Sequence, residues 1–156
     1  AFKIARKQNI TTVLNPAPAI ELPKSLLELT DIIIPNETEA ELLTGISINN
    51  ESDMKETATY FLDLGISAVL ITLGEQGTYC AYQEQYKMIP ACNVKAVDTT
   101  AAGDTFIGAF LSELNKDLSN LESAIRLANQ ASSLTVQRKG AQASIPTRKE
   151  VEAEYN

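Results

Sequence analysis

The sequence predicts an α/β fold in which a mostly parallel sheet, Rossmann-like in plan, is flanked by helices and carries one β-hairpin. Short apolar runs rich in β-branched residues, at 10–15, 31–35 and 67–74, alternate with segments of helical periodicity. That alternation is typical of parallel strands buried between helices. Two further apolar runs, 77–82 and 85–90, are separated by only two residues, which indicates the hairpin.

The individual elements follow from local signals along the chain. Gly45 and Gly65 each follow a helical pattern directly and are expected to end it. Helices are expected at 25–29, 36–45, 51–64, 121–134 and 147–155, and a further apolar helical face at 106–114 belongs to a helix that begins near Gly103. The opening segment AFKIARKQN looks like the tail of a helix that started earlier, so we expect the chain to begin inside an α/β unit. The whole of residues 1–156 is expected to form a single α/β domain.

Composition excludes several classes of function. A formal net charge of −7 argues against a nucleic-acid binder, because such proteins present basic surfaces to phosphates. No apolar run is long enough for a membrane span, so no membrane partner is expected. The chain contains no histidine, which excludes Ser-His and Cys-His nucleophile pairs. Cys80 and Cys92 are expected to be free thiols in a cytoplasmic protein, although a disulfide between them is the alternative.

The stretch AVDTTAAGDTFIGAF at 96–110 is the strongest candidate for chemistry. A helix that begins near Gly103 would leave its first amide groups without partners, and the helix dipole would make that end positive. Small side chains at Ala101, Ala102 and Gly103 would let a phosphate approach these amides. Asp104 could then accept a proton from an attacking hydroxyl group. The alternative is a capped helix start, in which Thr100 or Asp104 satisfies the amides.

Several motifs in one order give the chain a family resemblance. DTTAAGDTFIGAF resembles the second signature of the ribokinase (phosphofructokinase-B type) family of sugar kinases, which has the form D-T-x-[GA]-A-G-D-x-F. PNETEAELLTG contains the family's N-x-x-E motif, TLGEQG resembles its nucleotide loop, and RKGAQASIP resembles its cation-binding loop. NPAPA is also typical of bacterial members. The resemblance covers the C-terminal part of such a kinase, without the N-terminal half and lid.

The resemblance implies a role for each matching residue. Asp104 is the expected catalytic base and sugar contact, and Ala101, Ala102, Gly103 and Asp104 together form the expected anion hole. Asn36 and Glu39 are expected near Mg²⁺ and the phosphates, although a plain helix cap explains them equally well. The residues expected to contact ATP are Asn36, Thr72, Gly74, Glu75, Gln76, Gly77, Ala102, Gly103 and Asn129. Those expected to surround K⁺, mostly through carbonyl oxygens, are Asp98, Thr100, Thr135, Arg138, Gly140 and Ser144.

Taken together, the resemblance implies transfer of a phosphoryl group from ATP to D-ribose, giving D-ribose 5-phosphate, with Mg²⁺ and K⁺ as cofactors. The cation loop favours ribose over the substrate of another sugar or nucleoside kinase of the family, such as a fructokinase or a 2-keto-3-deoxygluconate kinase. A non-catalytic fragment that binds nucleotide is the remaining alternative. A homodimer is implied for the full-length form.

Overall fold

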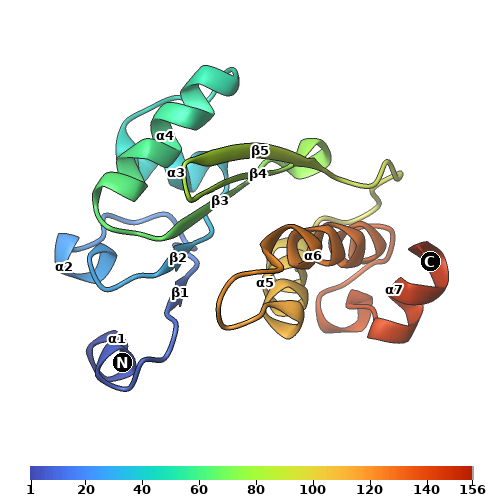
Figure 1. Cartoon of the computed structure of the whole chain (residues 1–156). Coiled ribbons are helices and arrows are strands. Elements are labelled where there is room, and N and C mark those ends of the chain that lie inside the picture. Colours follow the sequence, from blue (N-terminus) through green and yellow to red (C-terminus); the bar gives the residue numbers. More distant parts are fainter. Residues whose placement is uncertain (156) are drawn as a thin grey trace. The chain divides into compact units, whose positions relative to one another are not determined.

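The computed structural model describes residues 1–155, which divide into two compact units (Figure 1). The first unit contains residues 1–73 and 79–88. The second contains residues 74–78 and the chain from residue 89 onward. The single domain expected for residues 1–156 stays a prediction beside this division.

The first unit is built on parallel strands. Strand β1 (Val13–Leu14) pairs in parallel with β2 (Ile32–Ile33), and β2 pairs in parallel with β3 (Ala68–Thr72). The sheet continues in the order β1-β2-β3-β4-β5, which confirms the predicted α/β class with a mostly parallel sheet and a hairpin. The first two strands are much shorter than the apolar runs that predict them. Helices α1 (Phe2–Lys7) and α2 (Lys24–Leu27) occupy the N-terminal part of the unit.

Helices α3 (Glu37–Thr44) and α4 (Glu51–Asp63) pack against each other and against β3 (Figure 1). Met54, Ala58 and Phe61 of α4 are buried in one cluster with Val69 and Ile71 of β3. Their three- and four-residue spacing puts them on one helix face, as the periodicity predicts. Gly45 ends α3 in the left-handed conformation, which confirms its predicted role.

Strands β4 (Gly77–Tyr82) and β5 (Gln85–Pro90) form the predicted hairpin, with the predicted ends. The two turn residues, Gln83 and Glu84, have φ angles of 49° and 61°. Positive φ at both central positions suits the right-handed twist of a two-residue hairpin, although Asn and Gly adopt it more readily.

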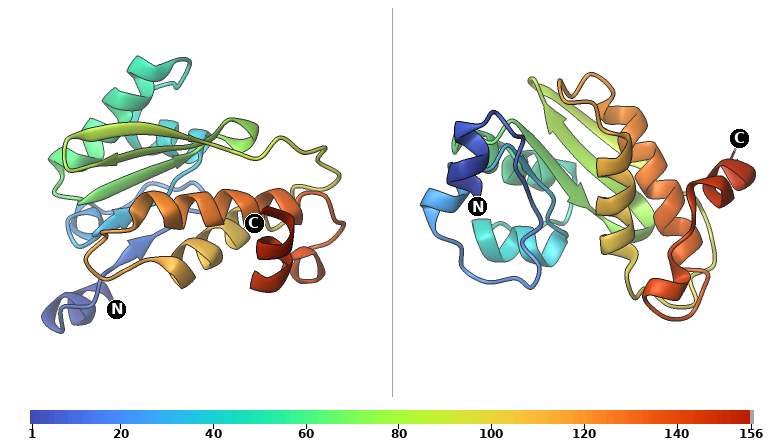
Figure 2. Two further views of the ribbon diagram at one scale, coloured as in Figure 1. Left: turned by 45° about the vertical axis from the view of Figure 1, so that its right-hand side comes forward. Right: turned by 90° about the horizontal axis from the view of Figure 1, so that it is seen from below.

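The second unit is mainly helical. Helices α5 (Ala102–Glu113) and α6 (Leu121–Thr135) pack side by side, and α7 (Arg148–Tyr155) packs against α6 (Figure 2). The rings of Phe106 and Phe110 stack with centroids 6.3 Å apart on the buried face of α5. Short 3-10 turns at Gly74–Gln76 and Gln142–Ser144 complete the unit.

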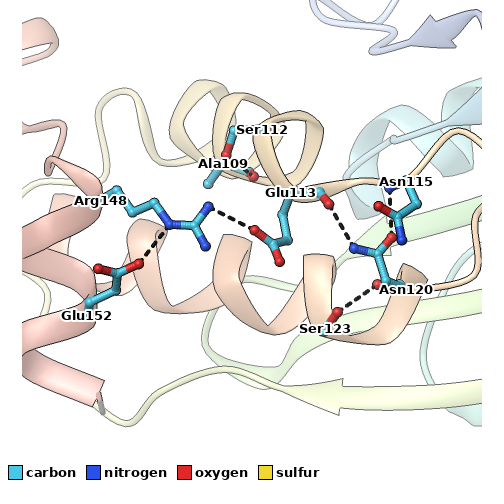
Figure 3. Close-up of polar contacts among 8 residues, drawn as sticks. All are labelled: Ala109, Ser112, Glu113, Asn115, Asn120, Ser123, Arg148 and Glu152. Atoms are coloured by element: carbon cyan, nitrogen blue, oxygen red, sulfur yellow. Dashed lines mark hydrogen bonds and ion pairs between the residues drawn. The ribbon is translucent and has the colours of Figure 1, made fainter.

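A polar network fixes the C-terminal end of α5 (Figure 3). The Asn120 amide donates to the Glu113 carbonyl over 2.7 Å, and its oxygen accepts the Asn115 N–H over 2.7 Å. The Arg148 guanidinium bridges the carboxylates of Glu113 and Glu152, each over 2.8 Å. Because these groups join α5, α6 and α7, they hold the far end of α5 in place while its first turn stays accessible.

Two further expectations concern the chain as a whole. Over residues 1–155, Cys80 and Cys92 are not joined in a disulfide, which agrees with the prediction of two thiols. Among the described residues, none of the helices has the length and apolar character that crossing a membrane would require.

Candidate active site at the start of helix α5

Helix α5 begins with an open turn. Its N-cap, Ala101, has φ 62° and ψ 9°, and no side chain caps the helix. The Ala102 N–H donates to the Thr99 carbonyl over 3.2 Å, and the Thr105 N–H donates to the Ala101 carbonyl over 2.9 Å. The intervening amides, of Gly103 and Asp104, lie in the first turn, where a helix supplies no partner of its own. The helix therefore starts one residue earlier than predicted, and without the side-chain cap that was the alternative.

Gly103 has no structural reason to be glycine. It is exposed, and a Cβ built on it meets nothing within 4 Å. Its backbone is helical, a conformation in which alanine is favoured by about 1 kcal/mol. The absence of a side chain leaves the backbone of the first turn accessible, and a phosphate contact at Gly103 stays a prediction.

Asp104 is exposed in the same first turn. It also lines a cavity of about 290 Å³ between α5, α6 and the segment that leads into α7. A carboxylate in this position can accept a proton from a hydroxyl group held near the open amides.

The segment 74–77 forms a tight turn at the base of the hairpin. Gly74 and Gly77 have φ angles of 54° and 112°. A Cβ on Gly77 would lie 2.2 Å from the Ile89 carbonyl oxygen, so this glycine is required by packing alone. The exposed residues Gly74, Glu75 and Gln76 are the part of the loop that is accessible to a ligand.

Asn129 does not present a free side chain. Its Nδ2 donates to the carbonyls of Ile89 and Pro90, each over 3.1 Å, and its Oδ1 accepts the Thr78 hydroxyl over 2.9 Å. The residue is buried, so these bonds satisfy an amide that would otherwise be costly to bury. A contact between Asn129 and adenine stays a prediction, and these hydrogen bonds leave it little polar capacity.

Asp98 joins two segments of the predicted cation site. One carboxylate oxygen accepts the Thr100 N–H over 2.9 Å, and the other accepts the Gly140 N–H over 2.9 Å. The Gly140 N–H and the hydrogen bonds from Thr100 lower the pKa of Asp98 to about 2, so the group is charged at neutral pH. The structure thus brings Asp98, Thr100 and Gly140 together.

The other three residues of the predicted cation site are less directly connected. The Arg138 N–H donates to the Thr135 carbonyl over 3.0 Å, while the Arg138 side chain pairs with Glu150 over 2.8 Å. Ser144 is buried and bonds within its own turn, to the Ala141 carbonyl. An ionised carboxylate such as Asp98 suits a hard cation, but a K⁺ site formed by these residues stays a prediction.

In the first unit, Asn36 and Glu39 form a complete capping box. The Asn36 Oδ1 accepts the Glu39 N–H over 2.8 Å, and the Glu39 carboxylate accepts the Asn36 N–H over 2.9 Å. Thr72 lies next to them, since it forms a bridge with Asn36 and its N–H donates to the Pro35 carbonyl over 2.9 Å. The capping interpretation is therefore realised, and the Mg²⁺ role of these residues stays a prediction.

Over residues 1–155, no group of three or more His, Cys, Asp or Glu side chains could hold a metal ion by itself. That finding is compatible with Mg²⁺, which is usually held by one or two carboxylates together with substrate phosphates and water.

Sequence reasoning missed two residues that contact the predicted site segments. Thr78 bonds to Asn129, and Ser132 donates from its hydroxyl to the Ala102 carbonyl over 2.9 Å. The available signal was the three-residue spacing of Asn129, Ser132 and Thr135 along a largely apolar helix face.

Comparison with known proteins identifies the family of the chain. The model of the pfkB family carbohydrate kinases matches residues 1–148. The chain belongs to this family. A ribokinase of Staphylococcus aureus is 64% identical over 151 residues, which cover 97% of this chain and 50% of that protein. The chain therefore spans about half the length of such pfkB family relatives.

Solved structures of ribokinases show the same fold. The Arabidopsis thaliana ribokinase complexed with ribose and ATP has 34% sequence identity and a TM-score of 0.90, and the match covers 97% of this chain and 49% of that one. An E. coli protein described as a putative ribokinase II, in complex with ATP and Mg²⁺, has 25% identity and a TM-score of 0.80, over 97% of this chain and 50% of that one.

Proposed function

We propose that this chain is the nucleotide-binding part of an ATP-dependent ribokinase-type sugar kinase. The reaction is transfer of the γ-phosphoryl group of ATP to the primary hydroxyl of D-ribose, which gives D-ribose 5-phosphate and ADP. The observation that carries the proposal is the open first turn of α5, with Gly103 bare and Asp104 exposed beside it. The ribokinase and the ribose-ATP complex among its relatives support the choice of substrates.

Each part of the site has its own role in the proposed phosphoryl transfer. The amides of the first turn of α5 stabilise the charge on the phosphoryl group during transfer, since they and the helix dipole are fixed in advance. Asp104 accepts the proton of the attacking sugar hydroxyl. Phosphoryl transfer depends mainly on positioning and charge stabilisation, so a weak base suffices. The exposed turn 74–76 contacts the nucleotide.

Two cations belong to the proposal. Mg²⁺ would be held by ATP phosphates and reached by Asn36 and Glu39 through water, and it would neutralise phosphate charge. K⁺ would be held at the carbonyl oxygens around Asp98, Thr100, Thr135, Arg138, Gly140 and Ser144, where the ionised Asp98 braces the 138–140 loop.

The first test is a calorimetric titration of this chain with MgATP, in KCl and again in NaCl. We expect binding that is tighter in KCl, with the Gly103→Ala variant binding more weakly than the parent chain. Equal MgATP affinity in KCl and NaCl would contradict the proposed K⁺ site. Absence of binding in both salts would contradict nucleotide binding by this chain.

Nucleotide binding without turnover is a second candidate for the isolated chain, because the chain spans only about half the length of its relatives. Release of ADP on addition of D-ribose and MgATP separates the two. Binding with no ribose-dependent ADP release supports the second candidate.

A further inference from the structure

Helix α6 has a polar row on an otherwise apolar face. Asn129, Ser132 and Thr135 follow one another at three-residue intervals, so each side chain is turned by about 60° around the helix from the one before it. Asn129 is 6% exposed and Thr135 is fully buried, among neighbours such as Ala128 and Ala131. A buried polar side chain without a hydrogen-bond partner costs free energy. The hydrogen-bond partners of these three residues therefore show which segments α6 holds in position.

The first partner is the base of the hairpin, directly after the 74–77 loop. Asn129 bonds to Thr78 on one strand and to the carbonyls of Ile89 and Pro90 on the other. The Ile89 carbonyl is also the group that Gly77 packs against most closely. The Asn129 side chain therefore bonds to both strands of the hairpin at the point where the 74–77 loop enters β4.

The second partner is the first turn of α5. The Ser132 hydroxyl donates to the Ala102 carbonyl over 2.9 Å, and the Thr135 hydroxyl lies 3.0 Å from that of Thr105. The Val136 carbonyl, at the end of α6, accepts the N–H groups of Val97 and Asp98 over 2.7 and 3.1 Å. The chain that leads into the open turn, and the turn itself, are thus both attached to α6.

We propose that α6 sets the relative position of the 74–77 loop and the 101–104 turn, with Asn129 as positioning residue for the loop and Ser132 as positioning residue for the turn. The inference rests on the proposed function in that both segments contact the nucleotide. Asn129 and Ser132 are three residues apart, so their Cα atoms are separated by about 4.5 Å along the axis of a stiff helix. A displacement of about 1 Å in such a geometry lowers phosphoryl-transfer rates substantially.

The experiment uses three variants of the chain and one control. Ser132→Ala removes the hydroxyl from the turn, and Ser132→Thr restores a hydroxyl. Asn129→Leu removes the contacts to the hairpin. If it fails to fold, Thr78→Val removes one of these contacts, the bond between the Thr78 hydroxyl and the Asn129 oxygen. Ser123→Ala is the matched control, because Ser123 lies on α6 and its hydroxyl donates to the Asn120 carbonyl near the start of the same helix (Figure 3).

The first readout needs no ligand. In amide proton–nitrogen spectra, Ser132→Ala should shift the Gly103 signal, and Asn129→Leu should shift those of Gly74 and Gly77. Gly45 and Gly65, which end helices in the first unit, should not move in either variant. A Gly103 signal that stays in place in Ser132→Ala would overturn the assignment of Ser132.

The second readout is the dissociation constant for MgATP. We expect a roughly tenfold weakening in Ser132→Ala, recovery in Ser132→Thr and no change in Ser123→Ala. An equal loss of MgATP affinity in Ser132→Ala and Ser123→Ala would mean that α6 supports the structure only in a general way. That result would overturn the proposal. If the parent chain does not bind MgATP, the proposed function fails for this chain, while the glycine signals still decide the positioning inference.

Discussion

Helices α3 and α5 both begin at sequence motifs predicted to contact phosphate, yet their first turns are built differently. At α3, Asn36 and Glu39 bond to each other's backbone N–H groups and satisfy the helix start from within. At α5, the N-cap is Ala101, and no side chain occupies that place. A helix start satisfied by its own side chains needs no ligand, whereas an open start has amides left for an anion. The difference identifies α5 as the better candidate for direct phosphate binding.

The largest expected effect concerns the first-turn acids of the two helices. Asp104→Asn in the full-length protein should lower turnover with ATP and D-ribose by about 100- to 10,000-fold, the usual contribution of a general base. ATP affinity should stay nearly unchanged. Glu37→Gln, at an exposed first-turn acid of α3, should leave turnover within about twofold. Steady-state kinetics measures both, and near-normal turnover in Asp104→Asn would contradict the base assignment.

The next prediction tests whether the uncapped first turn of α5 binds the nucleotide. Gly103→Ala should stabilise the chain by up to about 1 kcal/mol, because alanine is the better helix former. It should also weaken MgATP binding about tenfold, because the methyl group occupies the approach to the amides. Gly108→Ala is the matched control, since Gly108 is another exposed α5 glycine with space for a Cβ. Urea unfolding and calorimetry should show stabilisation in both variants but lost affinity only in Gly103→Ala.

The third prediction concerns the free energy of unfolding and the capped first turn of α3. Asn36→Ala removes the cap of α3 and should lower the free energy of unfolding by about 1 kcal/mol. Ala101→Gly at the start of α5 should raise it by a similar amount, because glycine adopts positive φ freely. Opposite signs in urea unfolding would support the comparison. A neutral Asn36→Ala would show that the capping box contributes little.

The smallest effect concerns the approach to α5. The pKa of Asp98 is lowered to about 2 in the folded chain, so its hydrogen bonds to Gly140 and Thr100 contribute stability above the unfolded pKa, near 4. That contribution is lost as pH falls from about 4 to 2. Asp98→Asn should therefore reduce the pH dependence of the unfolding midpoint in this window. An unchanged pH profile would mean that Asp98 does not hold the 138–140 loop.

Much of the fold was predictable because its signals are local. Gly45 ended a helix as expected, and the hairpin matched its predicted ends, with the turn at Gln83 and Glu84. Strands β1 and β2 were harder to delimit, because apolar sequence continues beyond the residues that pair. The open turn at Ala101 was placed within one residue.

Partners of buried polar residues could not be predicted in the same way. Periodicity places Asn129 and Ser132 on α6, but it carries no information on which carbonyls face them across 30 or more residues of chain. Likewise, the N-x-x-E spacing at Asn36 fits a cap and a phosphate contact equally, and only the structure shows that both side chains are used in the cap.

The left-handed conformation of Ala101 restricts how this position can change over evolutionary time. A β-branched or bulky residue is strongly disfavoured at φ 62°. Asn and Asp tolerate the conformation, but they carry side-chain oxygens that cap helix starts and would occupy the open amides. Glycine and alanine are therefore the two residues that keep both the backbone conformation and a helix start without a side-chain cap. A relative with any other residue at this position should have a rebuilt turn, or first-turn amides that are no longer open to an anion.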